Sequence, residues 1–153
     1  MTYVVDTCVL SDLRRGTKHP ELLRWWTDTS PDQLLVPAVV ISEIERGITR
    51  LRIQGRIAEA NDNDLWFRAL TLALPIIPYD GQIARLHGAL SISVPHDGTP
   101  SFERDLMIAA TALDTGAIIA TRNIRHFSLI AASTGLELLN PYDSPINIEA
   151  QSG

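Results

Sequence analysis

The sequence has little cysteine, little lysine and no long apolar run. Cys8 is its only cysteine and Lys18 its only lysine. One cysteine cannot form an intrachain disulfide or supply a CxxC pair, which excludes zinc ribbons and thioredoxin-type redox sites and suits a reducing compartment. No stretch approaches the roughly 20 apolar residues that cross a bilayer, and the N-terminus has no basic-then-apolar signal segment. We therefore expect a cytoplasmic protein with no membrane partner.

Positive charge is also scarce. The chain has 13 basic against 18 acidic residues, a formal net charge of -5, and all basic residues except Lys18 are arginines. This balance excludes nucleic-acid binding by bulk electrostatics, so any such contact must be local and made by planar guanidinium groups. Glycine and proline number only 18 among 153 residues and hydrophobic residues make up 45%, which excludes collagen-like and disordered chains. The length predicts one domain.

Short apolar segments alternate with segments of helical period along the chain. Strands are predicted at 3–5, 34–36, 76–77, 117–120 and 136–138. Helices are predicted at about 7–13, 20–26, 39–51, 56–74, 80–90 and 99–114, with Asp80 and Thr99 as N-caps and Gly116 as a C-terminal stop. This alternation indicates the α/β class, with a short central parallel sheet covered by helices on both faces. We predict a single domain over 1–142 and a flexible C-terminal tail over 143–153.

Acidic side chains fall where parallel sheets bind ligands. Asp6 ends the first strand, Glu43 and Asp105 lie near helix beginnings, and Asn123 follows the fourth strand. Because strand carboxyl ends and the following helix starts share one edge, these four can converge. Three clustered carboxylates repel one another unless their pKa values rise or a cation joins them. An all-oxygen ligand set favours Mg²⁺ or Mn²⁺ over zinc.

The predicted site favours hydrolysis of phosphodiester bonds. A hard cation held by few carboxylates keeps several waters, so one water can be activated while the metal neutralises phosphoryl oxygens. The competing route to RNA cleavage uses paired histidines as general acid and base. The four histidines, at 19, 87, 96 and 126, show no such pairing in the sequence. Attack by metal-activated water is therefore the preferred mechanism.

Four motifs in order resemble a known family. They are VVDTCVLS at 4–11, ISEI at 41–44, DLMIAATA at 105–112 and ATRN at 120–123, followed by Phe127. Together they resemble PIN-domain proteins, most of all the VapC and FitB toxins of bacterial toxin-antitoxin pairs, over about residues 1–142. The resemblance implies an endoribonuclease dependent on Mg²⁺ or Mn²⁺ that cuts tRNA or another structured RNA. It also implies a homodimer and inhibition by a cognate antitoxin whose C-terminal segment enters the site.

The resemblance assigns roles residue by residue. Asp6, Glu43 and Asp105 match the acidic metal-site positions of the family and Asn123 occupies the fourth, so these four are the expected catalytic and metal-binding residues. Four further residues match positions that support the site or approach phosphate: Thr7, Ser11, Thr121 and Arg122. The chain departs from the family at Cys8, where Asn is more usual, and at His126, where members with Asn in the fourth position often carry Asp.

Each acidic residue also has an ordinary structural interpretation. Asp6 could cap the next helix, and Asp105 could be a first-turn carboxylate favoured by the helix dipole. Glu43 could pair with Arg46 or Arg50 on its own helix face. The run of arginines from 46 to 56 could be a solvated helix face rather than a contact for RNA or antitoxin.

Two other functions compete with the nuclease. A receiver-like regulator would also cluster acids around Mg²⁺, but such domains carry a lysine after a late strand, whereas Lys18 lies early. A degenerate PIN domain that binds RNA or a protein without cleavage is the remaining alternative, and Asn123 and His126 are the residues that suggest it.

Overall fold

Five strands form one sheet in which every neighbouring pair is parallel. The computed structural model describes residues 1–143, so residues 144–153 of the predicted tail lie outside the described residues. The strands are β1 (Tyr3–Val5), β2 (Leu34–Pro37), β3 (Ile76–Ile77), β4 (Ile118–Ala120) and β5 (Leu138–Leu139), in the spatial order β3-β2-β1-β4-β5. All five overlap the predicted strands, although β5 shares only Leu138 with the predicted 136–138.

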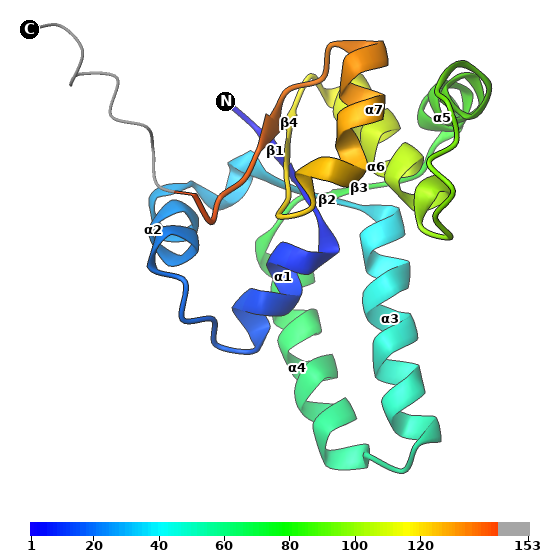
Figure 1. The fold of residues 1–153 in the computed structure, drawn as a ribbon. Helices are drawn as coiled ribbons and strands as arrows, with labels where there is room; N and C mark the ends of the chain where they lie inside the picture. Colours follow the sequence, from blue (N-terminus) through cyan, green and yellow to red (C-terminus); the bar gives the residue numbers. More distant parts are fainter. Residues whose placement is uncertain (144–153) are drawn as a thin grey trace, which may run out of the picture.

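Helices lie on both faces of this sheet, which confirms the predicted α/β architecture (Figure 1). They are α1 (Thr7–Arg14), α2 (Pro20–Asp28), α3 (Ala38–Ile53), α4 (Ile57–Ala73), α5 (Gly81–Ser93), α6 (Phe102–Thr115) and α7 (Ile124–Thr134). The α3 and α4 helices lie side by side as a long hairpin that extends away from the sheet (Figure 1). No helix within residues 1–143 is long and apolar enough to cross a membrane.

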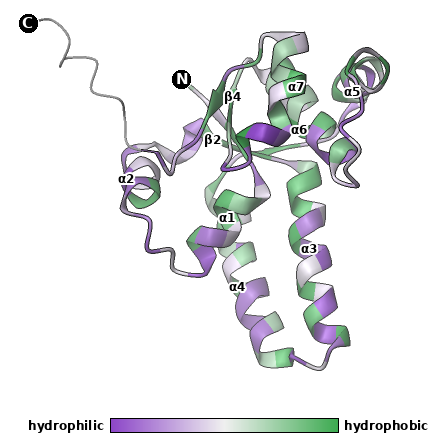
Figure 2. Cartoon of the chain, viewed as in Figure 1, coloured by the Kyte–Doolittle hydropathy of each residue, from purple (hydrophilic) through white to green (hydrophobic). Residues whose placement is uncertain are grey.

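The core is centred on β1. Val4 and Val5 are fully buried because β2 and β4 flank the strand and helices cover it. Leu106 of α6 and Phe127 of α7 are buried in the same cluster. Figure 2 shows the strands in hydrophobic colours, with hydrophilic residues on outer helix surfaces and at the C-terminal end of α1. Continuously apolar strands of this kind are typical of a parallel sheet buried on both faces.

The register of β1 and β4 positions the polar residues that follow them. Val5 pairs with Ala120, and the Asp6 N–H donates to the Ala120 carbonyl at 3.0 Å. Asp6 and Thr121 therefore leave the sheet side by side at its carboxyl edge, where ligands bind in open parallel sheets.

The start of α6 corrects one prediction. The helix begins at Phe102 with Ser101 as its N-cap, rather than at Pro100 with Thr99 as N-cap. Both the N–H and the hydroxyl of Thr99 donate to Asp97 Oδ1, so this residue belongs to a local turn. The predicted stop at Gly116 is confirmed, because this residue has a φ of 67° and ends the helix.

The region after β4 corrects two more. Helix α7 was not among the predicted helices, and β5 occupies Leu138–Leu139 instead of 136–138. Only Phe127 and Ile130 of α7 are buried. Gly135, with a φ of 75°, ends α7 and delays the strand.

Candidate functional site

A cavity of about 400 Å³ opens at the carboxyl edge of the sheet and collects most of the predicted site residues. Its lining includes the four expected catalytic residues, Asp6, Glu43, Asp105 and Asn123, and three of the four supporting residues, Thr7, Ser11 and Arg122. Thr121 does not line the cavity but is fully buried behind Asp6. Segments far apart in the sequence thus meet at one cavity. The metal-binding and catalytic roles assigned to them stay predictions.

Asp6 is fixed by three hydrogen bonds. Its Oδ1 accepts from the Thr7 N–H at 2.7 Å, so the ordinary interpretation of Asp6 as the cap of α1 is correct as far as it goes. Its Oδ2 accepts from the Thr121 hydroxyl at 2.7 Å and from Cys8 Sγ at 3.4 Å. Burial, followed by the nearby Asp6 charge, raises the pKa of the Cys8 thiol to about 11, so Cys8 is a neutral donor here. The Asp6 carboxylate therefore caps α1 and lines the cavity at the same time.

Glu43 is held across the cavity by residues of other helices. The Thr7 hydroxyl donates to its Oε2, and Arg104 Nη1 lies 2.8 Å from its Oε1. Pairing with Arg46 or Arg50 on the same helix is therefore wrong, because Glu43 faces the cavity rather than the α3 surface. The ion pair between Arg104 and Glu43 joins α6 to α3 at the wall of the cavity.

Asp105 is the most perturbed carboxylate of the cavity. It is 8% exposed, and its Oδ2 is buried without a hydrogen-bond partner among the described residues. The nearest histidine nitrogen, His126 Nδ1, lies 4.0 Å away, which is too far for a hydrogen bond. Burial first, and then the charge of Asp6, raise the pKa of Asp105 to about 7. A buried oxygen with a lone pair and no donor is unfavourable unless a proton or a cation reaches it.

The donor chemistry fits a hard cation, although the carboxylates are not gathered into a ready metal site. Within residues 1–143, no three His, Cys, Asp or Glu side chains are grouped closely enough to hold a metal ion. Glu43 accounts for part of this separation, since Thr7 and Arg104 occupy its two oxygens. The unpartnered Asp105 oxygen is the feature of the cavity that suits a cation.

The remaining predicted residues lie on the β4 side of the cavity. Arg122 Nη1 contacts Asp12 Oδ2 at 3.1 Å, and the Tyr142 hydroxyl donates to the same oxygen at 2.6 Å. Asn123 is the N-cap of α7, but its side chain makes no capping hydrogen bond, so its amide remains available to the cavity. Its N–H donates to the Thr121 hydroxyl at 2.9 Å.

Sequence reasoning missed three charged residues of the cavity, Asp12, Arg15 and Arg104. Asp12 positions Arg122, and Arg104 pairs with Glu43. Asp12 had a weak signal, since it directly follows Ser11, an expected supporting residue, on the same predicted helix. Arg104 had none, because its partner is set by the packing of α6 near α3.

Comparison with known proteins places these observations in a family. Over 141 residues the chain is 27% identical to VapC ribonuclease Y4jK of Sinorhizobium fredii, covering 92% of this chain and 97% of that protein. The solved structure of FitAcB from Neisseria gonorrhoeae superposes with a TM-score of 0.75 at 20% identity, over 94% of this chain and all of that one. A toxin-antitoxin complex from Klebsiella pneumoniae gives a TM-score of 0.67 at 22% identity, with the same coverage.

These likenesses confirm the expected resemblance to VapC and FitB proteins. The match to the family model described as PIN domain extends over residues 3–132. This range contains strands β1 to β4 and every predicted site residue. The chain therefore belongs to the PIN domain family.

Proposed function

We propose that this chain is a metal-dependent endoribonuclease, the toxin of a toxin-antitoxin pair. The observation that carries the proposal is the buried Asp105 oxygen without a partner, on a residue that lines the same cavity as Asp6 and Glu43. Membership of the PIN family and likeness to a protein named VapC ribonuclease support the same activity.

Asp6, Glu43, Asp105 and Asn123 are the residues proposed to hold Mg²⁺ or Mn²⁺. A bound hard cation supplies charge neutralisation at the phosphate and activation of a water nucleophile. Asp105 supplies the oxygen that gains most, because it has no competing hydrogen bond. Glu43 must exchange its contact with Arg104 or Thr7 to take part.

The chain's own residues orient this site. Thr121 holds the Asp6 carboxylate by its hydroxyl, and the backbone N–H of Thr7 fixes the other oxygen. Arg122 lies at the cavity wall, half exposed, where its guanidinium can meet a phosphate of the substrate. Its contact with Asp12 already restricts the side chain, so Arg122 loses less conformational entropy when it binds a phosphate.

The proposed partners follow from the relatives. A structural neighbour is described as a toxin-antitoxin complex, and we propose that a cognate antitoxin inhibits this chain in the cytoplasm by occupying the site. The proposed substrate is RNA, with tRNA as the first candidate, and the proposed assembly is a homodimer.

The deciding experiment measures RNA cleavage by purified protein with Mg²⁺, with Mn²⁺ and with EDTA. Asp6→Asn, Glu43→Gln and Asp105→Asn should each lower the rate at least about 100-fold, the scale of losing one charged group that stabilises a transition state. Glu103→Gln is the matched control, because Glu103 lies on α6 two residues from Asp105 but pairs with His87 outside the cavity. Full activity in EDTA would contradict the proposal, and RNA binding with no cleavage under any metal would favour the degenerate PIN domain.

A further inference from the structure

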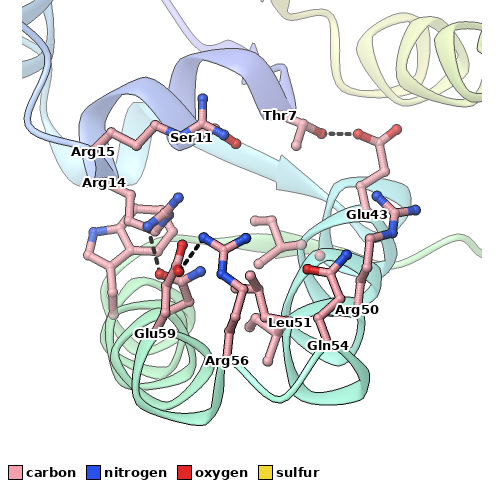
Figure 3. A pocket seen from close by; sticks show the side chains of 15 residues that line it. Thr7, Ser11, Arg14, Arg15, Glu43, Arg50, Leu51, Gln54, Arg56 and Glu59 are labelled. Carbon is pink, nitrogen blue, oxygen red and sulfur yellow. Dashed lines mark hydrogen bonds and ion pairs between the residues drawn. The ribbon is translucent and has the colours of Figure 1, made fainter.

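A second cavity of about 400 Å³ lies between α1 and the α3–α4 hairpin (Figure 3). It shares Thr7, Ser11, Arg15 and Glu43 with the acidic cavity, so the two cavities adjoin. We call this second cavity the hairpin groove. Figure 3 shows the contact between Thr7 and Glu43 at one end of the groove, where the acidic cavity begins.

The hairpin groove is rich in arginine although the chain as a whole is acidic. Arg14 and Arg15 come from the end of α1, Arg50 from α3, and Arg56 precedes α4. Only two carboxylates, those of Glu43 and Glu59, line it. In a chain with a net charge of -5, positive charge is thus concentrated beside the acidic cavity.

Two of these arginines have no ion pair and no side-chain hydrogen bond among the described residues. Within residues 1–143, neither Arg15 nor Arg50 has a carboxylate within 4.0 Å, and both are exposed. The other two are engaged, Arg14 with Asn63 at 2.6 Å and Arg56 with Glu59. Burial, and then the charge of the adjacent Arg15, lower the pKa of Arg14. An anion placed between Arg14 and Arg15 would relieve the repulsion between them.

Part of the lining of the hairpin groove is apolar, and we call this part the floor. Ile44, Ile48 and Trp66 line it together with Gly47. A Cβ placed on Gly47 would meet nothing within 4 Å, so the groove has free space above this helical position. A glycine inside a helix costs about 1 kcal/mol relative to alanine, and here it leaves the floor bare.

We propose that the hairpin groove binds the single-stranded segment of RNA that adjoins the cleaved bond, with phosphates on Arg15 and Arg50 and a base over the apolar floor near Trp66. The inference rests on the proposed function only in placing the cleaved bond in the acidic cavity. Binding of RNA to the hairpin groove does not depend on cleavage. Guanidinium groups with an aromatic, apolar floor are the combination that binds single strands without reading sequence. The RNA strand would run from the hairpin groove to the acidic cavity, because Arg15 lines both cavities.

A protein segment is the competing occupant, and the aromatic part of the lining favours RNA over it. An acidic peptide would satisfy the same arginines, but it brings no planar bases to stack on Trp66. A nucleic acid keeps its phosphates at the rim and presents uncharged bases to the floor.

Two variants separate the effect of positive charge from the effect of free volume in the groove. Arg15→Gln/Arg50→Gln removes the two arginines whose side chains have no partner among the described residues. Arg46→Gln/Arg85→Gln is its control with the same charge change, because neither arginine lines the groove or the acidic cavity. Gly47→Leu fills the floor while every charge remains, and it favours the helix. Gly47→Ala is the control for the helical effect alone.

Binding of a fluorescent single-stranded RNA oligonucleotide of mixed sequence is measured in EDTA, so that the RNA stays intact, as a function of salt. Arg15→Gln/Arg50→Gln should reduce the slope of log affinity against log salt by about 1.4, at about 0.7 for each phosphate contact, and weaken binding at least tenfold. Gly47→Leu should weaken binding with an unchanged slope. Both controls should match the wild type.

The outcomes keep this inference apart from the proposed function. A wild type that binds RNA through these arginines but never cleaves it would contradict only the nuclease. Cleavage with metal, but with equal RNA affinity and slope in Arg15→Gln/Arg50→Gln and the control, would overturn only the groove assignment. Unchanged RNA binding together with loss of the co-expressed antitoxin would give the groove to a protein segment instead. Circular dichroism of each variant shows whether it is folded.

Discussion

The Thr121 hydroxyl donates to Asp6 Oδ2 at 2.7 Å, joining the ends of two adjacent parallel strands. Thr121 is completely buried, and its oxygen also accepts from the Asn123 N–H. One side chain therefore fixes both a carboxylate of the proposed site and the backbone at the start of α7.

Thr121→Val should remove both hydrogen bonds at nearly constant volume. We expect the free energy of unfolding to fall by about 1–3 kcal/mol, because the buried Asp6 oxygen and Asn123 N–H lose a partner. RNA cleavage should fall with it, since Asp6 Oδ2 then keeps only the weak contact with Cys8 Sγ. Urea denaturation and cleavage rates measure the two effects. Thr121→Ser keeps the hydroxyl and should retain most of the activity; equal stability of the valine variant and the wild type would show that the hydrogen bonds contribute nothing.

Asp105→Asn should abolish cleavage while stabilising the metal-free protein at alkaline pH. The folded-state pKa of about 7 lies above the unfolded value, so between about pH 4 and 7 the folded protein holds a proton that the unfolded chain has lost. The contribution of Asp105 to stability therefore declines as pH rises through this window and is lowest above it. In EDTA, the melting temperature of Asp105→Asn should exceed that of the wild type more at pH 8 than at pH 5. A gain that is the same at both pH values would refute the raised pKa.

Arg104→Gln should increase the affinity for Mg²⁺ by several-fold. Arg104 lies 2.8 Å from Glu43 Oε1, so its charge competes with a cation for that carboxylate. Titration calorimetry with Mg²⁺ measures the change, and Arg85→Gln controls for the general loss of positive charge. Weaker binding in Arg104→Gln would mean that Arg104 positions Glu43 for the metal rather than competing with it.

Asn123→Asp should also increase the affinity for Mg²⁺, because it adds a fourth carboxylate to the cavity. The Asn123 side chain makes no capping bond in the structure, so the substitution breaks no contact of α7. Calorimetry that shows unchanged or weaker binding would remove Asn123 from the proposed ligands.

Local features of the sequence predicted much of this fold. Tyr3 to Val5 could be recognised as a buried strand from three apolar residues, and the positive φ of Gly116 follows from glycine at a helix end. Thr99 was misassigned as an N-cap because an equally local competitor, Asp97, captures its hydroxyl. Helix α7 was missed although it is flanked by Asn123 and Gly135, residue types that are typical of helix ends.

The site was predictable in membership but not in arrangement. That Asp6, Glu43 and Asp105 share a cavity follows from strand and helix ends meeting at one sheet edge. The attachment of Glu43 to Arg104 depends on how α6 packs near α3, and no spacing in the sequence reports it. The empty hydrogen-bonding position on Asp105 Oδ2 is likewise a product of packing, since exposed first-turn aspartates have water there.

The order of the strands also bears on the synthesis of this protein. Asp6 follows the central strand β1 and is synthesised 115 residues before its hydrogen-bond partner Thr121. A nascent chain that has not reached β4 lacks one flank of β1 and the hydroxyl that orients Asp6. The proposed catalytic site would therefore be assembled only after β4 and Thr121 have been synthesised.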